Sequence, residues 1–68
     1  MGVKIQVGSA DIVKANSKQV EAEGWETIVD ACDTRGALEE LVRKLNDGSI
    51  CSENNWFRIV VGKMVIKI

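Results

Sequence analysis

Apolar and polar residues alternate near both ends of this chain. Residues 3–7 alternate one by one, and so do residues 56–61 and 64–68, which is the period-two pattern of β-strands. Gly62-Lys63 separates the last two runs, and glycine at the first position of a two-residue turn suits a type II′ hairpin. The pattern therefore predicts an N-terminal strand and a C-terminal hairpin.

Residues 8–32 are harder to interpret. Gly8-Ser9 predicts a first tight turn, after which residues 10–15 return as a short strand. Residues 25–32 fit two patterns. A helix would place Trp25, Ile28, Val29 and Cys32 on one apolar stripe, whereas a strand would place Trp25, Thr27, Val29 and Ala31 on one face. A strand is favoured because the helix that follows needs an extended residue before its cap. Gly24 would then lie at a bulge or bend, after a turn at residues 16–18.

One helix is predicted over residues 34–47. Its apolar stripe has spacings of three and four and consists of Ala37, Leu38, Leu41, Val42 and Leu45. Asp33 or Thr34 can cap the first turn by accepting a hydrogen bond from a free amide. Asn46-Asp47-Gly48 supplies a left-handed stop.

These elements predict one α+β domain over residues 1–68, in the order β-β-(β)-α-β-β, with a small mixed sheet and one helix packed on it. Two hairpin-like units flanking a helix resemble the β-grasp architecture of ubiquitin-like proteins and immunoglobulin-binding bacterial domains. The resemblance is one of element order alone. The chain ends in Lys67-Ile68 and not in the Gly-Gly that ubiquitin-like modifiers use, so their chemistry is not implied.

Composition narrows the classes of function. The 68 residues suit one domain, and 46% are hydrophobic and 28% charged, as in ordinary globular proteins. No apolar run has the ~18 residues of a membrane span, and the start lacks a secretory pattern, so a cytoplasmic protein without membrane contact is expected. The net charge of −1 disfavours a dedicated nucleic-acid binder.

Catalytic chemistry has little support in the residue types present. The chain has no His and no Tyr, and no glycine-rich phosphate loop. Cys32 lies in an acidic stretch, which disfavours a reactive thiolate. Cys32 and Cys51 are interpreted as two reduced thiols, the alternatives being a disulfide or half of a metal site. We therefore expect no enzyme, cofactor or metal.

The best candidate site is one side of the predicted sheet. The odd residues 57–61 and the even residues 64–68 are expected to face the helix. The opposite side then presents six partner-binding candidates: Trp56, Arg58, Val60, Val65, Lys67 and Lys4. Gln6 lies beside them. This side can bind a protein partner or a second copy, can stack single-stranded nucleic acid, or can be a half-wet face without a role. Trp25 is expected in the core and Trp56 exposed as an anchor.

The first hypothesis is a small non-enzymatic interaction module, an adaptor or inhibitor of the kind that phages and mobile elements encode. It would bind a protein partner, or itself as a homodimer, through the exposed sheet face or an edge strand. The alternative is a binder of an anionic small ligand or single-stranded nucleic acid, in which Lys4, Arg58 and Lys67 meet the negative charge.

Overall fold

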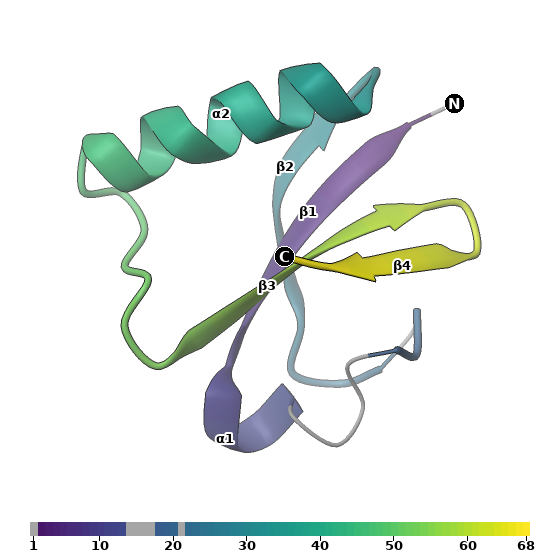
Figure 1. Ribbon diagram of the computed structural model, residues 1–68. Coiled ribbons are helices and arrows are strands. Elements are labelled where there is room, and N and C mark those ends of the chain that lie inside the picture. Colours follow the sequence, from purple (N-terminus) through teal and green to yellow (C-terminus); the bar gives the residue numbers. More distant parts are fainter. Residues whose placement is uncertain (1, 14–17, 21) are drawn as a thin grey trace.

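The protein is a four-stranded antiparallel sheet with one main helix packed across one side (Figure 1). The computed structural model describes residues 2–13, 18–20 and 22–68. The elements in chain order are β1 (Val3–Ser9), α1 (Ala10–Val13), β2 (Glu26–Ala31), α2 (Thr34–Asn46), β3 (Asn55–Val61) and β4 (Met64–Lys67). The strands lie in the order β2-β1-β3-β4. The small α+β class is therefore confirmed.

The C-terminal hairpin and the helix agree with their sequence patterns. β3 and β4 pair from Val61↔Met64 to Arg58↔Lys67, and Gly62 in the turn has a φ of 60°, which favours glycine. α2 begins after Asp33, whose carboxylate accepts a hydrogen bond from the Gly36 amide at 2.6 Å. Alternation and capping were thus sufficient to place both elements.

The predicted first hairpin is wrong. The residues after Ser9 form the short helix α1 instead of a returning strand, and residues 14–17 lie outside the described part of the chain. Gly8 provides close packing here and not a turn, because a Cβ on it would lie 2.4 Å from Val13 Cγ1. The Ala10 amide donates to the Asn54 carbonyl at 2.9 Å, which joins the start of α1 to the residue before β3.

The strand predicted before the helix is present as β2, but the sheet is not mixed. β2 and β3 both pair with β1, and each pairing is antiparallel. The register shifts between Ile5 and Gln6, opposite Ile28, so a bulge lies inside β2; Gly24, with a φ of 90°, lies in the turn before it. No parallel pair exists among the described strands, so the predicted mixed sheet is wrong.

The core lies between the sheet and α2. It contains Val3, Ile5, Val29, Ala37, Leu41 and Ile59. The other side of the sheet, called here the outer face, is covered in part by α1 and by residues 19, 20, 24 and 25, and Val13 is fully buried. Within the described residues, no helix is long and apolar enough to cross a bilayer.

Candidate protein-interaction surface

The strand register places the predicted partner-binding residues on one face of the sheet, as alternation indicates. Lys4 pairs with Val60, Val60 pairs with Val65, and Arg58 pairs with Lys67. Directly paired residues project to the same side of an antiparallel sheet. This is the outer face, opposite α2.

Arg58 lies on this face but is not exposed. Its residue surface is 0% accessible, and its Nε donates to Gln6 Oε1 at 2.7 Å. Its Nη1 and Nη2 donate to the carbonyl oxygens of Gln19 and Val20 at 2.6 and 2.9 Å. The guanidinium carbon also lies 4.2 Å from the ring centroid of Trp25. The prediction that Arg58 is available to a partner is therefore wrong.

The environment of Arg58 explains its burial. Desolvation lowers the pKa of the guanidinium, but an arginine in a protein stays charged at neutral pH. A buried cation is tolerated where hydrogen bonds and an aromatic face replace its water. Arg58 therefore fastens Gln19, Val20 and Trp25 to the sheet. Val60, at 7% exposed, is likewise buried, so its predicted role at the surface is also wrong.

The rest of the predicted site forms a smaller surface. Lys67 is exposed, and its Nζ lies 3.5 Å from the ring centroid of Trp56. Lys4 is exposed, and Val65 is half-buried. Trp25 and Trp56 are both half-buried, so the expected division into one core and one exposed tryptophan is wrong. Lys4, Trp56, Val65 and Lys67 can border an interface.

The most exposed large apolar side chains of β4 and the residue after it lie on the other side of the sheet. Met64, Ile66 and Ile68 have exposed fractions of 62%, 46% and 55%, and we call these three residues the apolar row. Ile66 pairs with Ile59, a core residue that is only 5% exposed, so the row lies on the α2 side. The sequence pattern predicted that these residues face the helix, yet they are open to solvent.

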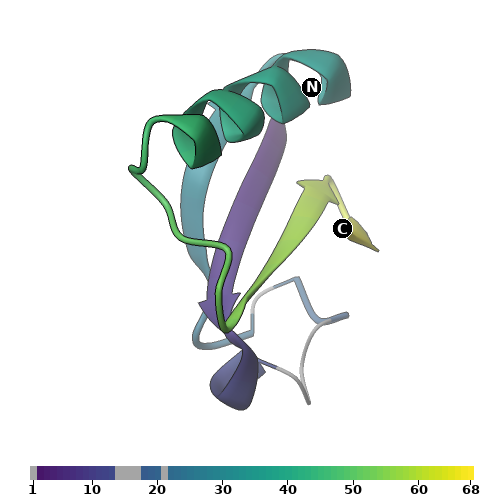
Figure 2. The same cartoon turned by 60° about the vertical axis from the view of Figure 1, so that its left-hand side comes forward.

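The row is open because α2 does not reach it. The helix packs mainly against β2 and β1, and the β3–β4 hairpin diverges beyond it (Figure 2). An α-helix is about 10 Å wide and strands lie about 4.8 Å apart, so one helix covers about two strands. One long helix for four strands therefore indicates that about half of this side of the sheet stays uncovered.

β4 is also an edge strand with free backbone groups. The Ile68 amide donates to the Phe57 carbonyl at 3.1 Å. Because hydrogen-bonded and non-bonded pairs alternate in an antiparallel ladder, the amides and carbonyls of Val65 and Lys67 point away from β3. An edge of this kind can accept another extended segment.

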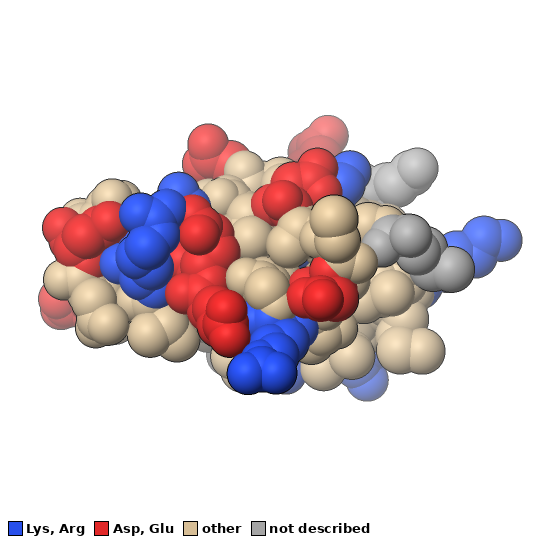
Figure 3. All heavy atoms as spheres, turned by 90° about the horizontal axis from the view of Figure 1, so that it is seen from above, with Lys and Arg blue, Asp and Glu red and all other residues tan. Residues whose placement is uncertain are grey.

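Charge is distributed unevenly between the hairpin and the rest of the protein. Residues 55–68 contain three bases and no acid, and the two exposed bases are Lys63 and Lys67. On α2 the charges are paired instead: Arg35 Nε lies 3.3 Å from Glu39 Oε1, and Arg43 bonds Glu40. Both signs accordingly occur across the upper face of the molecule (Figure 3). The exposed charged side chains of the hairpin are thus all positive.

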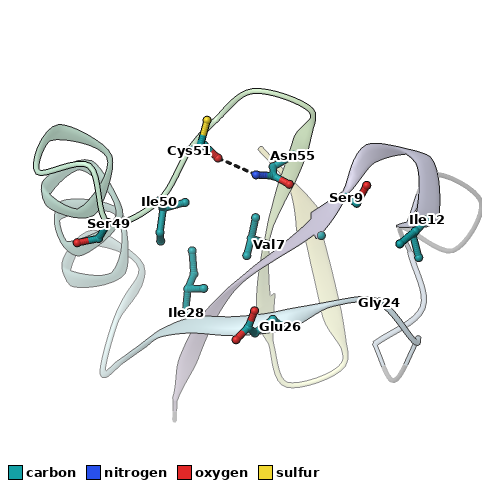
Figure 4. Close-up of a pocket in the computed structure, with 11 residues that line it drawn as sticks. Val7, Ser9, Ile12, Gly24, Glu26, Ile28, Ser49, Ile50, Cys51 and Asn55 are labelled. Atoms are coloured by element: carbon teal, nitrogen blue, oxygen red, sulfur yellow. Dashed lines mark hydrogen bonds between the residues drawn. The ribbon is translucent and has the colours of Figure 1, made fainter.

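A pocket of about 520 Å³ opens at the opposite end of β3 from the hairpin turn. Val7, Ile28 and Ile50 point toward one another between the sheet and the α2–β3 loop (Figure 4). Glu26 supplies the one charge among its lining residues, and Asn55 Nδ2 donates to the Cys51 carbonyl at 2.8 Å. The walls can hold a small apolar group. No pair of poised acid and base groups lies among these lining residues.

Both cysteines are unpaired and exposed. The part of the chain that the structure describes holds no group of three His, Cys, Asp or Glu side chains that could bind a metal ion. Comparison with protein-family models, with curated proteins and with solved structures finds no significant match. Any function is therefore inferred from this chain's own surface.

Proposed function

We propose that this protein is a non-catalytic protein-interaction module that binds a protein partner through β4. The observation that supports this function is the apolar row: Met64 and Ile66 are exposed on one face of the edge strand β4, and Ile68 is exposed directly after its end. Contiguous exposed apolar surface on a small protein is typical of an interaction site. The proposal keeps the edge strand of the sequence hypothesis and moves the main contact to the α2 side of the sheet.

The remaining outer-face residues can border this interface. Lys67 and Val65 belong to the same strand as the row and project to its other side, with Trp56 beside Lys67. A partner that wraps around the edge would meet both sides of β4, with apolar contacts inside and polar ones at the margin. Arg58 and Val60 take no part, since both are buried.

The test is affinity capture with matched variants. Immobilised wild-type protein should retain specific proteins from an extract of its source cells, and Met64→Gln with Ile66→Thr should lose them because the apolar contact is removed. Ile12→Gln is the control, because Ile12 is 65% exposed on α1 and not part of the row. Capture that is absent, or equal for all three proteins, would remove β4 as the site.

The alternative function, binding of an anionic ligand or single-stranded nucleic acid, has less support. Of its three proposed cations, Arg58 is buried against backbone carbonyls, which leaves Lys4 and Lys67 exposed. Titration of a labelled oligonucleotide at low salt checks it, because phosphate binding weakens steeply with salt. The resemblance to β-grasp proteins remains a proposal about architecture, and no activity of that family is carried over.

A further inference from the structure

The pocket between the sheet and the α2–β3 loop has the size of a small-molecule site. Its volume is about 520 Å³, within the range of about 300–1,000 Å³ that is usual for pockets that bind small ligands. One wall comes from β1 and β2, and the other comes from the residues that follow α2 (Figure 4). Val7 and Glu26 are directly paired across β1 and β2, so both side chains project to the same side of the sheet, into this space.

Hydrogen bonds fix the wall that the loop provides. Asn55 Nδ2 donates to the Cys51 carbonyl at 2.8 Å, and the Glu53 amide donates to Cys51 Sγ at 3.4 Å. The Ser49 amide donates to Asp47 Oδ1 at 2.8 Å. These bonds hold the wall without a ligand, and most small-molecule sites are preformed in this way.

The apolar part of the pocket suits a hydrocarbon group. Val7, Ile28 and Ile50 point toward one another (Figure 4), and each of them is half-buried. Each therefore keeps accessible apolar surface, which a hydrocarbon group placed among them would remove from water. A compact branched or ring-shaped group is the shape that contacts three converging side chains.

One carboxylate sets the charge of the pocket. Glu26 is exposed and is the one charged residue of the lining. Its carboxylate makes no hydrogen bond or ion pair within the described residues. Glu26 and Ile28 both line the pocket and are two residues apart along β2, a distance of about 6–7 Å. An ammonium group joined to the hydrocarbon group by one or two bonds would reach the carboxylate.

We infer that this pocket binds a small molecule in which a protonated amine is joined to a compact branched or cyclic hydrocarbon group. The hydrocarbon group lies among Val7, Ile28 and Ile50, and the ammonium group donates to the Glu26 carboxylate. An opposite charge in the lining favours a cation over a neutral or anionic ligand of the same shape. The pocket lies at the opposite end of β3 from the hairpin turn, so this inference does not depend on the proposed function of β4.

The experiment compares three probes of one shape: cyclohexylmethylamine, cyclohexylmethanol and cyclohexanecarboxylate. Each is titrated into the intact protein at neutral pH, and the amide resonances report both the affinity and the place of binding. The amine should bind with a Kd of about 1 mM and shift the resonances of Val7, Ile28 and Ile50. The alcohol should bind about threefold more weakly and the carboxylate more weakly still, because an exposed ion pair makes a modest contribution.

Matched variants separate the pocket from the general charge and stickiness of the protein. Glu26→Gln should reduce the affinity for the amine about threefold, to that for the alcohol. Asp30→Asn is its control, because Asp30 belongs to the same strand but pairs with Lys4 on the outer face, and it should leave the affinity unchanged. Ile50→Ala should weaken all three probes by about threefold or more. Ile66→Thr, with an exposed side chain outside the pocket, should weaken none of them.

Several results would overturn the inference. These are no shifts with the amine at about 10 mM, equal binding of the three probes, or an equal loss of amine affinity in Glu26→Gln and Asp30→Asn. Shifts confined to Met64, Ile66 and Ile68 would also overturn it, because the probe would then bind the apolar row and not the pocket.

Discussion

Arg58 shows how one side chain changes the accessible surface of a small sheet. Alternation along β3 places it on the outer face, and the register confirms that position. Its burial comes from the backbone of residues 19 and 20 and from Trp25, and these three residues lie outside the described strands and helices. A sequence pattern predicts the side to which a residue points, but it does not reveal an irregular segment that folds over it.

We expect Arg58→Met to lower the free energy of unfolding by roughly 2–4 kcal/mol, because two backbone carbonyls and Gln6 lose a charged donor. Urea unfolding at neutral pH measures the loss. Lys4→Met is the control, since Lys4 is exposed on the same face, and it should change the value by less than about 0.5 kcal/mol. Equal effects of the two substitutions would show that Arg58 does not fasten Gln19, Val20 and Trp25 to the sheet.

Gly8→Ala tests the packing that replaced the predicted turn. The added Cβ would lie 2.4 Å from Val13 Cγ1 and 2.9 Å from the Gly24 carbonyl oxygen, so we expect a loss of about 1–3 kcal/mol in unfolding free energy from overpacking. Gly2→Ala is the control, because its nearest atom would be 3.7 Å away. Thermal unfolding of both variants is the measurement; a stable Gly8→Ala protein would contradict the close contact.

At the scale of elements, the helices and strands that were predicted correctly are those with strong local sequence signals. α2 has a cap at Asp33 and a periodic stripe, and β3–β4 has a glycine turn between two alternating runs; both were predicted from sequence. The same glycine signal at Gly8-Ser9 misled, because a glycine needed for close packing looks identical in sequence to one needed for a turn. The strand β2 was ambiguous because its bulge at Ile28 interrupts the alternation.

The exposed charges of α2 predict a small acid sensitivity. A hydrogen bond from Arg43 lowers the pKa of Glu40, and hydrogen bonds with Ser49 lower the pKa of Asp47. Between the lowered pKa values of the folded protein and the ordinary ones, the unfolded chain binds more protons than the folded protein. The stabilisation is therefore present above the ordinary pKa values of about 4.5 and 3.8. It is lost as the pH falls through the pKa values of the folded protein. Urea midpoints from pH 7 down to about pH 2 should fall, and Glu40→Gln should flatten that fall; a parallel fall in the variant would contradict the role of Glu40.

At the scale of the whole molecule, the sheet is covered unevenly. α2 covers half of one side, α1 and residues 19, 20, 24 and 25 cover part of the other, and the α2 side of the hairpin is open. Sequence periodicity assigned the correct side to nearly every strand residue of the hairpin, but cover depends on where the helix crosses the sheet. That crossing is a property of tertiary packing, which explains why the outer face was chosen as the site and the apolar row was missed.

Because α2 covers only part of the sheet, substitutions on the same sheet face should lower the free energy of unfolding by unequal amounts. Ile59→Ala should cost about 2–4 kcal/mol in unfolding free energy, because Ile59 is buried beside α2. Met64→Gln, on the same face but 62% exposed, should cost less than about 0.5 kcal/mol. Urea unfolding of the two variants compares them, and a large loss for Met64→Gln would mean that the row belongs to the core and not to an interface.

The contact between Arg58 and residues 19 and 20 joins positions that are 39 and 38 residues apart. The same guanidinium also bonds Gln6 across the β1–β3 pair, so we expect these carbonyls to be captured after β3 has aligned beside β1. Refolding should therefore proceed in two stages, with the sheet first and this segment last. In stopped-flow experiments, the tryptophan fluorescence, to which Trp25 and Trp56 both contribute, would reach its final value later than the far-ultraviolet circular dichroism, and a protease present during refolding would cut the segment before it attaches.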